Sequence, residues 1–337
     1  MTSVDSEGHR QPNVPQEGGP PPGPPSLKRQ GTNWNLIGEW FTAFIAFFAI
    51  AAVVLIFIFL FREASPILFD AVIRAEVTLG SMFQWQGISD MINYWQPVSD
   101  EPRYGIWPLI AATLKISLLA VALALPVGLM AAIYSAEFAP RALREIIKPV
   151  VELLAGIPSV VLGFFALMIL ANWLQALFGW DYRLNSALAA IALSIMVIPI
   201  LFSVAEDALL AVPQNLREAS AALGATRIQT AFRTVVPAAL PGLFGAVVLS
   251  VGRVIGETMV VLMVAGNAAI FNFNVFDPAR TLSATIASEM AEVVTGSPHY
   301  TVLFVLGVVL LIMTSFLNGI SDWVMTRFMR KLHGKAR

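Results

Sequence analysis

The sequence has no cysteine, only three histidines and few charged residues for its length. Without cysteine the chain can form neither a disulfide nor a thiolate metal site, and the scattered His9, His299 and His333 offer no ligand cluster. Charged residues make up 13% of the 337 residues, whereas roughly 25% is usual in a soluble domain. Hydrophobic residues make up 57%. This balance excludes an ordinary soluble domain and predicts a protein of the lipid bilayer.

The sequence also lacks the common motifs of nucleotide-binding and hydrolytic sites. It contains no G-x-x-x-x-G-K-[ST] phosphate loop, no H-E-x-x-H and no G-x-S-x-G. We therefore expect no catalytic residue, no metal site and no cofactor in this chain, so that any ATP must be bound by another chain. The net charge of -1 gives no electrostatic reason to expect a nucleic acid as partner.

Long uncharged runs are what the sequence does have. A helix needs about 20 apolar residues to cross the roughly 30 Å of hydrocarbon in a bilayer. Five uncharged runs reach this length, and a sixth is apolar except for Arg253 and Glu257. The six runs cover residues 41–61, 116–136, 153–180, 184–205, 238–265 and 301–321. The predicted fold is an all-α polytopic membrane protein with six transmembrane helices.

The distribution of lysine and arginine predicts the orientation of these helices. If both termini are cytoplasmic, the cytoplasmic side holds fourteen of the 21 basic residues and the opposite side holds five, while Lys115 and Arg253 lie in or beside the spans. The positive-inside rule expects this asymmetry. We therefore expect both termini and the polar segment 206–237 to be cytoplasmic.

The ends of the chain and its outer loops differ in composition from the spans. Residues 1–34 include "GGPPPGPP" and are expected to be a disordered Pro/Gly-rich cytoplasmic leader, while residues 327–337 form a basic cytoplasmic tail. Residues 35–106 hold the first span and a long extracytoplasmic loop. That loop, and a second one before the sixth span, are expected to form short interfacial or re-entrant helices.

The polar segment in the middle of the chain has clear helix start and stop signals. Pro213 suits a first helical position and Gly224 suits a left-handed residue just past a helix end, so we expect a short helix over residues 213–223. Thr226 and Gln229 match a capping box that opens a second helix toward Pro237. A helix this short is marginal by itself in water. It could dock on a partner protein or pack on its own chain, and these signals leave both open.

This segment resembles the EAA loop of ATP-binding-cassette importer permeases. In "EASAALGATRIQTAFRTVVP", Glu218, Ala219, Gly224 and Pro237 match the family pattern, while Ser220 replaces its third alanine. Thr234 and Val236 also depart from the pattern, but the spacing is intact. In that family the short helix is a coupling helix that sits in a groove of the cytoplasmic ATPase. The resemblance therefore assigns coupling to the following residues: Arg217, Glu218, Ala219, Ser220, Gly224, Ala225 and Pro237.

Several stretches resemble the PstC type of permease in bacterial phosphate importers. They are "YGIWPLIAATLKIS", "LLAGIPSVVLGFFAL", "GRVIGETMVVLMVAGN" and "RTLSATIASEM". The resemblance implies a type I importer (MetI-like) permease domain over residues 107–326, in the bacterial cytoplasmic (inner) membrane. It implies four kinds of partner: a second permease of the PstA type, a PstB-type ATPase dimer that binds ATP and Mg, a PstS-type extracytoplasmic phosphate-binding protein, and membrane lipid.

Two alternatives to phosphate import stay open at this point. The cargo could be another oxyanion, such as molybdate, sulfate or phosphonate, carried by the same kind of machine. A self-sufficient channel or secondary transporter is a different class, for which inverted repeats or several intramembrane carboxylates would be expected. The sequence shows neither feature clearly.

Arg253 and Glu257 are the two charges inside the predicted fifth span. A charge at membrane depth costs about 2.5 to 3.5 kcal/mol on insertion scales, so it faces protein or water and usually has a partner. On a continuous helix the two would share one face. They could line the translocation pathway for an anion or form a structural ion pair. Gly252 and Gly256 form a G-x-x-x-G step that predicts close helix packing.

Other charged and proline positions have simpler interpretations. Lys115 lies near the start of the second span, and we expect it to extend to the outer interface of the membrane. Glu206 and Asp207 are expected to be a solvated helix end that leads into the coupling loop. Pro158 lies inside the third span, where it can kink the helix.

Overall fold

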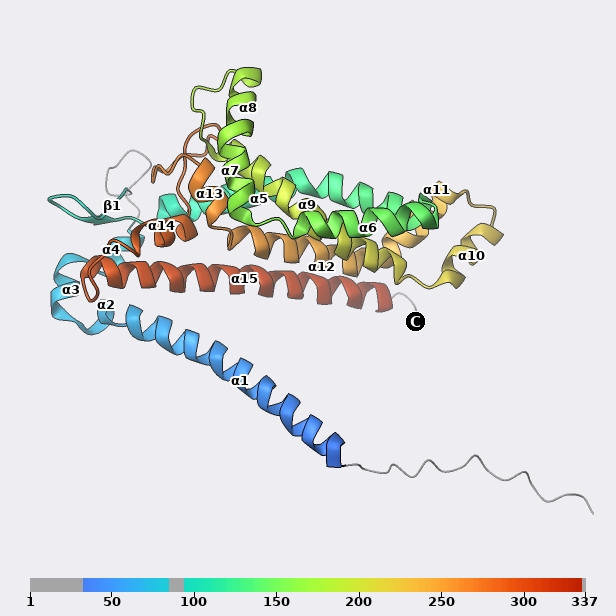
Figure 1. Ribbon diagram of the computed structural model, residues 1–337, viewed down its shortest axis with the longest axis horizontal. Coiled ribbons are helices and arrows are strands. Elements are labelled where there is room, and N and C mark those ends of the chain that lie inside the picture. The colour runs from blue at the N-terminus through green and yellow to red at the C-terminus, as the bar shows by residue number, and fades with distance from the viewer. Residues whose placement is uncertain (1–32, 85–93, 335–337) are drawn as a thin grey trace, which may run out of the picture. The chain divides into compact units, whose positions relative to one another are not determined.

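The computed structural model describes residues 33–84 and 94–334 (Figure 1). The chain divides into two units, residues 1–56 and 57–337, and the described part of the first unit is the N-terminal portion of helix α1 (Asn33–Ala64). The leader predicted for residues 1–34 lies outside the described residues except for its last two, which already belong to α1. The end of the predicted tail, residues 335–337, also lies outside them.

Six helices are long and apolar enough to cross a membrane, which confirms the predicted number of spans. They cover Gly38–Phe69, Trp107–Phe138, Ser159–Phe178, Ser186–Leu210, Arg227–Ile255 and Pro298–Ile320. The predicted spans begin later than the observed ones for the second and fifth helices, because Lys115 near the start of the second and Arg227 and Arg233 near the start of the fifth end the uncharged runs. Hydropathy detects the apolar centre of a helix and not its capped ends.

The spans are built from the following helices. The second is α5 (Trp107–Ile133) with the π-helical turn η2 (Tyr134–Phe138). The third is α7 (Ser159–Phe165), η3 (Ala166–Leu170) and α8 (Ala171–Phe178), preceded by the amphipathic helix α6 (Arg141–Ala155). The fourth is α9 (Ser186–Leu210). The fifth is α11 (Arg227–Thr230), η4 (Ala231–Val235) and α12 (Val236–Ile255), and the sixth lies in α15 (Pro298–Gly334).

Helix α9 is the centre of the bundle. It packs between α5 and α12, and α12 in turn packs against α15 (Figure 1). Small residues allow these close approaches, because helices in a membrane associate by tight packing rather than by escape from water. A Cβ added to Gly128 would meet the Leu201 side chain, and one added to Gly242 would meet Ala208, each at less than 3.0 Å.

Short elements cover the end of the bundle opposite the coupling loop. They are α2 (Pro66–Phe69), α3 (Ala71–Glu76), α4 (Leu79–Phe83), α14 (Leu282–Glu289) and a two-stranded antiparallel hairpin of β1 (Trp95–Gln96) and β2 (Arg103–Tyr104). Their apolar side chains form a second core with the first turns of α15, including Ile67, Met82, Ile106 and Leu303. The short helices were expected here, whereas the hairpin was not.

Candidate functional site

The predicted coupling helix is present as α10 (Gln214–Ala222). Pro213 is its N-cap residue rather than its first helical residue, and Leu223 ends it. Gly224 has φ 82°, the left-handed conformation that its position predicts. Thr226 and Gln229 form the expected reciprocal capping box at the start of α11. The helix, turn and second helix that the local sequence signals predict are therefore confirmed.

The second helix of this loop was predicted to run toward Pro237, and in the structure it continues past this proline. It runs from α11 through η4 into α12, so the coupling loop passes directly into the fifth span. Proline lacks a backbone N–H and its ring clashes with the carbonyl four residues earlier. The π-helical turn η4 ends at Val235, two residues before Pro237, and changes the hydrogen-bond register there, which lets the helix continue.

One face of α10 is open. No residue of α10 is buried, and the apolar side chains of Leu216 in α10 and of Leu223 and Ile228 after it are 41%, 90% and 63% exposed. Glu218 and Ala219 are exposed on the same helix. A nine-residue helix is too short to be stable by itself in water. Contacts on its other face must hold it in place.

Arg217 and Ser220 make those contacts. Arg217 forms an ion pair of 2.8 Å with Glu137, which belongs to η2 at the end of the second span. Ser220 Oγ lies 3.0 Å from Thr230 Oγ1 and accepts a hydrogen bond of 3.3 Å from Thr234. The predicted coupling residues therefore separate into an exposed set and a set that ties α10 to the spans. Glu137 was not found from the sequence, because no motif marks it.

Glu206 is not solvated, which corrects our expectation. Its side chain is 0% exposed, it accepts a hydrogen bond from Ser135 Oγ, and its other oxygen lies 4.0 Å from Lys148 Nζ. Asp207 does face outward and pairs with Lys148 at 2.6 Å. The hydrogen bond from Lys148 to Asp207 raises the pKa of Lys148, and its effect is larger than the lowering caused by burial. Glu206 is buried because α6 and η2 pack against this end of α9.

The predicted fifth span is interrupted where its charges lie. Helix α12 ends at Ile255, and α13 (Met259–Val264) begins after a short non-helical segment. Glu257 Oε1 accepts hydrogen bonds from the backbone N–H groups of Met259 and Val260 at 3.2 and 3.5 Å. The expectation that Arg253 and Glu257 share one face of a continuous helix is wrong, because the helix ends just before Gly256 and Glu257 accepts from the first N–H groups of the next helix.

Arg253 is exposed and has no ion pair or hydrogen bond with the side chains and backbone that the structure describes. A Cβ on Gly252 would lie 3.8 Å from Asn318 Oδ1 of α15, an ordinary contact distance, while Gly256 is exposed and near only the backbone of its own turn. Neither glycine is required by a close approach of another described helix.

The predicted third span, residues 153–180, is interrupted in the same way. Gly156 after α6 and Gly256 after α12 have the same backbone conformation, φ −79° and ψ −7°. The surrounding sequences, "AGIPSVVL" and "IGETMVVL", align residue for residue. Pro158 therefore begins a new helix, α7, instead of kinking a continuous one. The sequence analysis did not predict this repeat, because the two segments have the same backbone conformation at the glycine while several of their aligned residues differ.

The two interruptions face each other through α7 and α13. A Cβ on Gly163 would lie 3.3 Å from the Cα of Val260 and 2.9 Å from Met263 Sδ. The short helices therefore pack with their backbones close together. Two interrupted helices in contact can expose backbone groups inside a bundle, which continuous helices do not.

Lys115 does not extend freely to the interface. Its Nζ donates to Asn272 Oδ1 and to the Asn274 carbonyl at 2.9 Å each, and it lies 3.4 Å from the Asn272 carbonyl. Asp277 accepts from the side-chain amides of both asparagines. Lys115 thus anchors the segment between α13 and α14 to the second span, an arrangement set by residues about 160 positions away.

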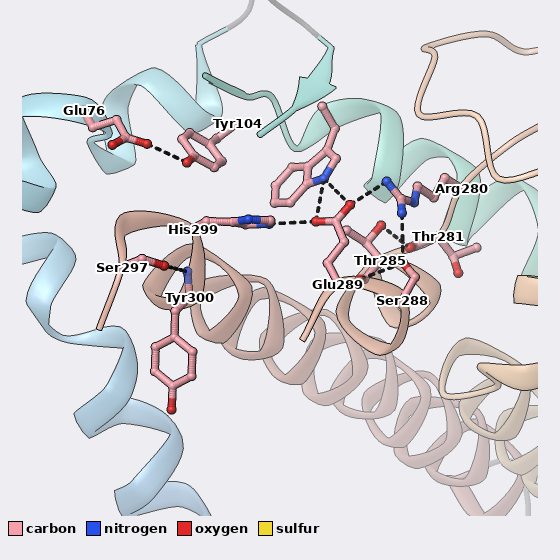
Figure 2. A network of polar contacts seen from close by, with 11 residues as sticks. Glu76, Tyr104, Arg280, Thr281, Thr285, Ser288, Glu289, Ser297, His299 and Tyr300 are labelled. Carbon is pink, nitrogen blue, oxygen red and sulfur yellow. Dashed lines mark hydrogen bonds and ion pairs between the residues drawn. The ribbon is translucent and has the colours of Figure 1, made fainter. Parts of the chain in front are cut away.

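A polar network joins the elements at the opposite end of the bundle (Figure 2). Glu289 pairs with Arg280 at 2.6 Å and with His299 at 2.8 Å, and it accepts from Trp95 Nε1 at 3.0 Å. Burial acts to raise the pKa of Glu289, but the hydrogen bonds and the Arg280 charge outweigh it and leave this pKa below its usual value. The network connects the hairpin, α14 and α15.

A hydrogen bond of 2.7 Å from Tyr104 to Glu76 continues these polar contacts toward α3 (Figure 2). Burial, and then this bond to a carboxylate, raise the pKa of Tyr104. A cavity of about 600 Å³ lies beside Arg280 and Glu289 and opens between the hairpin and α14. Sequence spacing alone did not identify this cluster, since its members come from four separate segments.

These features lie on a membrane-spanning helical bundle with an exposed helix at one end and a polar network at the other. The described ranges contain no group of three or more histidine, cysteine or acidic side chains that could hold a metal ion. They do contain an exposed helix tied to several spans, two interrupted helices in contact, and an exposed arginine beside one interruption.

Comparison with known proteins agrees with this description. Residues 124–334 match the family of binding-protein-dependent transport system inner membrane components. The chain is 42% identical to the probable ABC transporter permease protein YqgH of Bacillus subtilis, over 65% of this chain and 71% of that protein. It is 34% identical to the phosphate transport system permease protein PstC of Mesorhizobium japonicum (72% and 81%) and 32% identical to PstC 1 of Mycobacterium tuberculosis (67% and 74%).

Solved structures show the same fold at low identity. One is the MetNI methionine ABC transporter in an inward-facing conformation, with a TM-score of 0.53 and 21% identity, over 66% of this chain and 97% of that one. Another is a bacterial alginate ABC transporter, with a TM-score of 0.55 and 15% identity, over 87% and 98%. The chain has the type I importer fold and belongs to the binding-protein-dependent transport system inner membrane components, a family of non-catalytic, multi-pass permeases.

Proposed function

We propose that this permease forms half of the translocation pathway of an ATP-driven importer of inorganic phosphate. The observation that carries the proposal is the agreement between an exposed, EAA-type helix and relatives named as phosphate permeases that align over most of both chains. The chain supplies the passage, and ATP and Mg are bound by a separate ATPase dimer.

The proposed partners follow from the surfaces of the chain. The side chains of Leu216 in α10 and of Leu223 and Ile228 after it are exposed, as docking to a groove of a PstB-type ATPase requires. A PstA-type permease completes the pathway, and a PstS-type binding protein delivers phosphate at the opposite end. In this arrangement α10 and both termini are cytoplasmic, in agreement with the positions of the basic residues.

Arg253 is proposed to contact the transported anion. A guanidinium is always charged and can donate two parallel hydrogen bonds to phosphate oxygens. Arg253 is exposed and not paired with Glu257 in the part of the chain that the structure describes, which favours the pathway role over a structural ion pair. Gly252 and Gly256 leave space for a helix of the second permease beside it.

The test is reconstitution of the complete importer in proteoliposomes. The chain is purified with the ATPase, second permease and binding protein encoded beside it, and uptake of labelled phosphate is measured with and without ATP. Excess unlabelled sulfate, molybdate and phosphonate distinguish phosphate from the other oxyanions. Uptake by this chain alone without ATP would contradict the proposal and indicate a channel or secondary transporter.

The orientation has an independent test. Because the chain has no native cysteine, a Leu223→Cys variant carries a single thiol on an exposed side chain. Labelling by a membrane-impermeant maleimide is expected only when the cytoplasmic face is opened. Labelling in cells whose outer envelope is permeabilised but whose inner membrane is intact would place α10 on the extracytoplasmic side and contradict the proposed orientation.

A further inference from the structure

Glu137 is a charged residue that neither the EAA pattern nor the predicted pathway includes. It lies in the π-helical turn η2 at the end of the second span, and its side chain is only 9% exposed. Its partner Arg217 lies 80 residues further along the chain, in the middle of α10, and is 17% exposed. A shielded ion pair thus joins the coupling helix to a span that does not follow it in sequence.

The guanidinium of Arg217 is held on several sides. Its NH2 donates to Glu137 Oε1 at 2.8 Å and to the Leu209 carbonyl at 2.9 Å, and its Nε lies 3.3 Å from the same Glu137 oxygen. Its NH1 donates to the Val212 carbonyl. A planar guanidinium bound in this way has a defined orientation. Arg217 therefore connects α10 both to the end of the second span and to the end of the fourth.

The turn that carries Glu137 is itself anchored. Arg144 of α6 donates to the carbonyls of Ser135 and Ala136 at 3.0 and 2.7 Å, and Ser135 donates to the buried Glu206. A π-helical turn displaces backbone carbonyls from their usual partners, which makes them available to Arg144. Glu137 thus extends from a fixed base and does not move independently of the second span.

The other attachments of α10 differ in kind. Ser220 contacts Thr230 and Thr234 through neutral hydroxyl groups at 3.0 and 3.3 Å, and these residues belong to the fifth span that follows α10 directly. Within the described residues, the ion pair with Glu137 is the only one that α10 makes. The covalent chain already couples α10 to the fourth and fifth spans, so only a contact can couple it to the second.

We propose that Glu137 is a positioning residue through which movement of α10, driven by the ATPase, is passed to the second span. This inference rests on the proposed coupling function of α10. The second span then moves with the fourth and fifth as one unit. Loss of the Glu137 carboxylate leaves the open face of α10 unchanged, so the ATPase still binds and hydrolyses ATP. The movement of α10 is then passed only in part to the second span.

The test compares phosphate uptake with ATP hydrolysis in the reconstituted complete importer. Glu137→Gln is expected to leave assembly and hydrolysis close to the parent values and to lower the phosphate taken up per ATP by about tenfold, within the usual range of coupling between sites. Asp207→Asn is the matched control, because Asp207 is a carboxylate at the same end of the bundle that pairs with Lys148 and not with α10. Its uptake per ATP is expected to stay at the parent value.

A chemical rescue separates coupling from a purely structural role. In the naturally cysteine-free chain, Glu137→Cys is assembled into the importer and then treated with a methanethiosulfonate reagent that carries either a sulfonate or a trimethylammonium group. The parent importer receives both reagents as the control for its other subunits. The anionic reagent is expected to restore uptake per ATP and the cationic one is not.

Three results would overturn the inference: an unchanged uptake per ATP in Glu137→Gln, a proportional loss of uptake and hydrolysis, or equal rescue by both reagents. Failure of the parent importer to take up phosphate with ATP would instead contradict the proposed function. The two failures are therefore distinguishable in one set of measurements.

Discussion

The contact between Gly242 of α12 and Ala208 of α9 predicts a strong and local effect of a single methyl group. A Cβ added to Gly242 would lie less than 3.0 Å from Ala208 Cβ and 3.4 Å from Ala208 Cα. Non-bonded carbon atoms prefer about 3.5 to 4.0 Å. Ala208 has no rotatable side chain, so Gly242→Ala must push the two helices apart.

The size of the effect follows from a matched comparison. An Ala in place of Gly in a helix interior stabilises by about 1 kcal/mol by intrinsic propensity, whereas overpacking costs about 1 to 3 kcal/mol. Gly245 lies in the same helix, and a Cβ there meets no atom within 4 Å. Gly245→Ala should therefore show the gain alone, and Gly242→Ala should be less stable than Gly245→Ala by about 1 to 3 kcal/mol.

A double variant that moves the methyl group from Ala208 to Gly242 provides a second test of the contact between the two helices. Ala208→Gly removes the opposing Cβ, so the double variant Gly242→Ala with Ala208→Gly should regain most of what Gly242→Ala loses. The intrinsic helix terms cancel in the double variant, and the interaction energy between the two sites should be about 1 to 3 kcal/mol. Thermal unfolding of the detergent-solubilised protein, followed by size-exclusion fluorescence, gives the order of stability. Equal midpoints for Gly242→Ala and Gly245→Ala would refute the packing of α12 on α9 described above.

Three further predictions concern coupling, pH and the anion. Gly224→Val should leave the bundle folded but abolish phosphate uptake, because a β-branched residue is strained at φ 82° while no atom lies within 4 Å to clash; Gly224→Asn, which tolerates this conformation, should keep uptake, and equal activity of both variants would contradict the coupling turn. The pKa of Glu289 is lower in the folded protein than its unfolded value near 4.5, so its network stabilises the fold above pH 4.5, and this contribution is lost as pH falls through the lower folded pKa. The thermal unfolding midpoint should therefore fall below pH 4.5 in the parent protein, and Glu289→Gln should lack this fall. An equal fall in both proteins would contradict the role of Glu289. Arg253→Ala should lower phosphate uptake with the importer still assembled, whereas Glu257→Gln, which retains an acceptor for the α13 N–H groups, should retain more uptake; loss of assembly in Arg253→Ala would indicate a structural role instead.

Local patterns were sufficient for the coupling loop and the number of spans. Each span is detected from about 20 consecutive residues, and the turn at Gly224 and the capping box at Thr226 depend on residues within one helical turn. The interruption at Gly256 was missed because an apolar run continues across it, and hydropathy does not report where backbone hydrogen bonds stop. The repeat of this interruption at Gly156 would have been visible only by comparing the two segments directly.

The contacts of the charged residues could not be predicted in this way. We expected Glu206 to be solvated because it lies near a helix end, but its burial depends on Ser135, 71 residues away. Lys115 is held by Asn272 and Asn274, and Trp95 donates to Glu289 across 194 residues. Sequence spacing gives no information about which distant side chains meet.

The sequence by itself determined that this chain is a six-span membrane protein with a short helix that ends just before Gly224, because hydrophobic length, helix caps and the left-handed Gly224 act over a few neighbouring residues. Only the tertiary structure decided that the Glu257 side chain accepts from the first N–H groups of a new helix instead of pairing with Arg253, and that Arg217 turns inward to Glu137. The physical reason is that a charge inside a membrane bundle takes whichever partner the packing of other helices brings within hydrogen-bond distance, and that packing is set by the whole bundle.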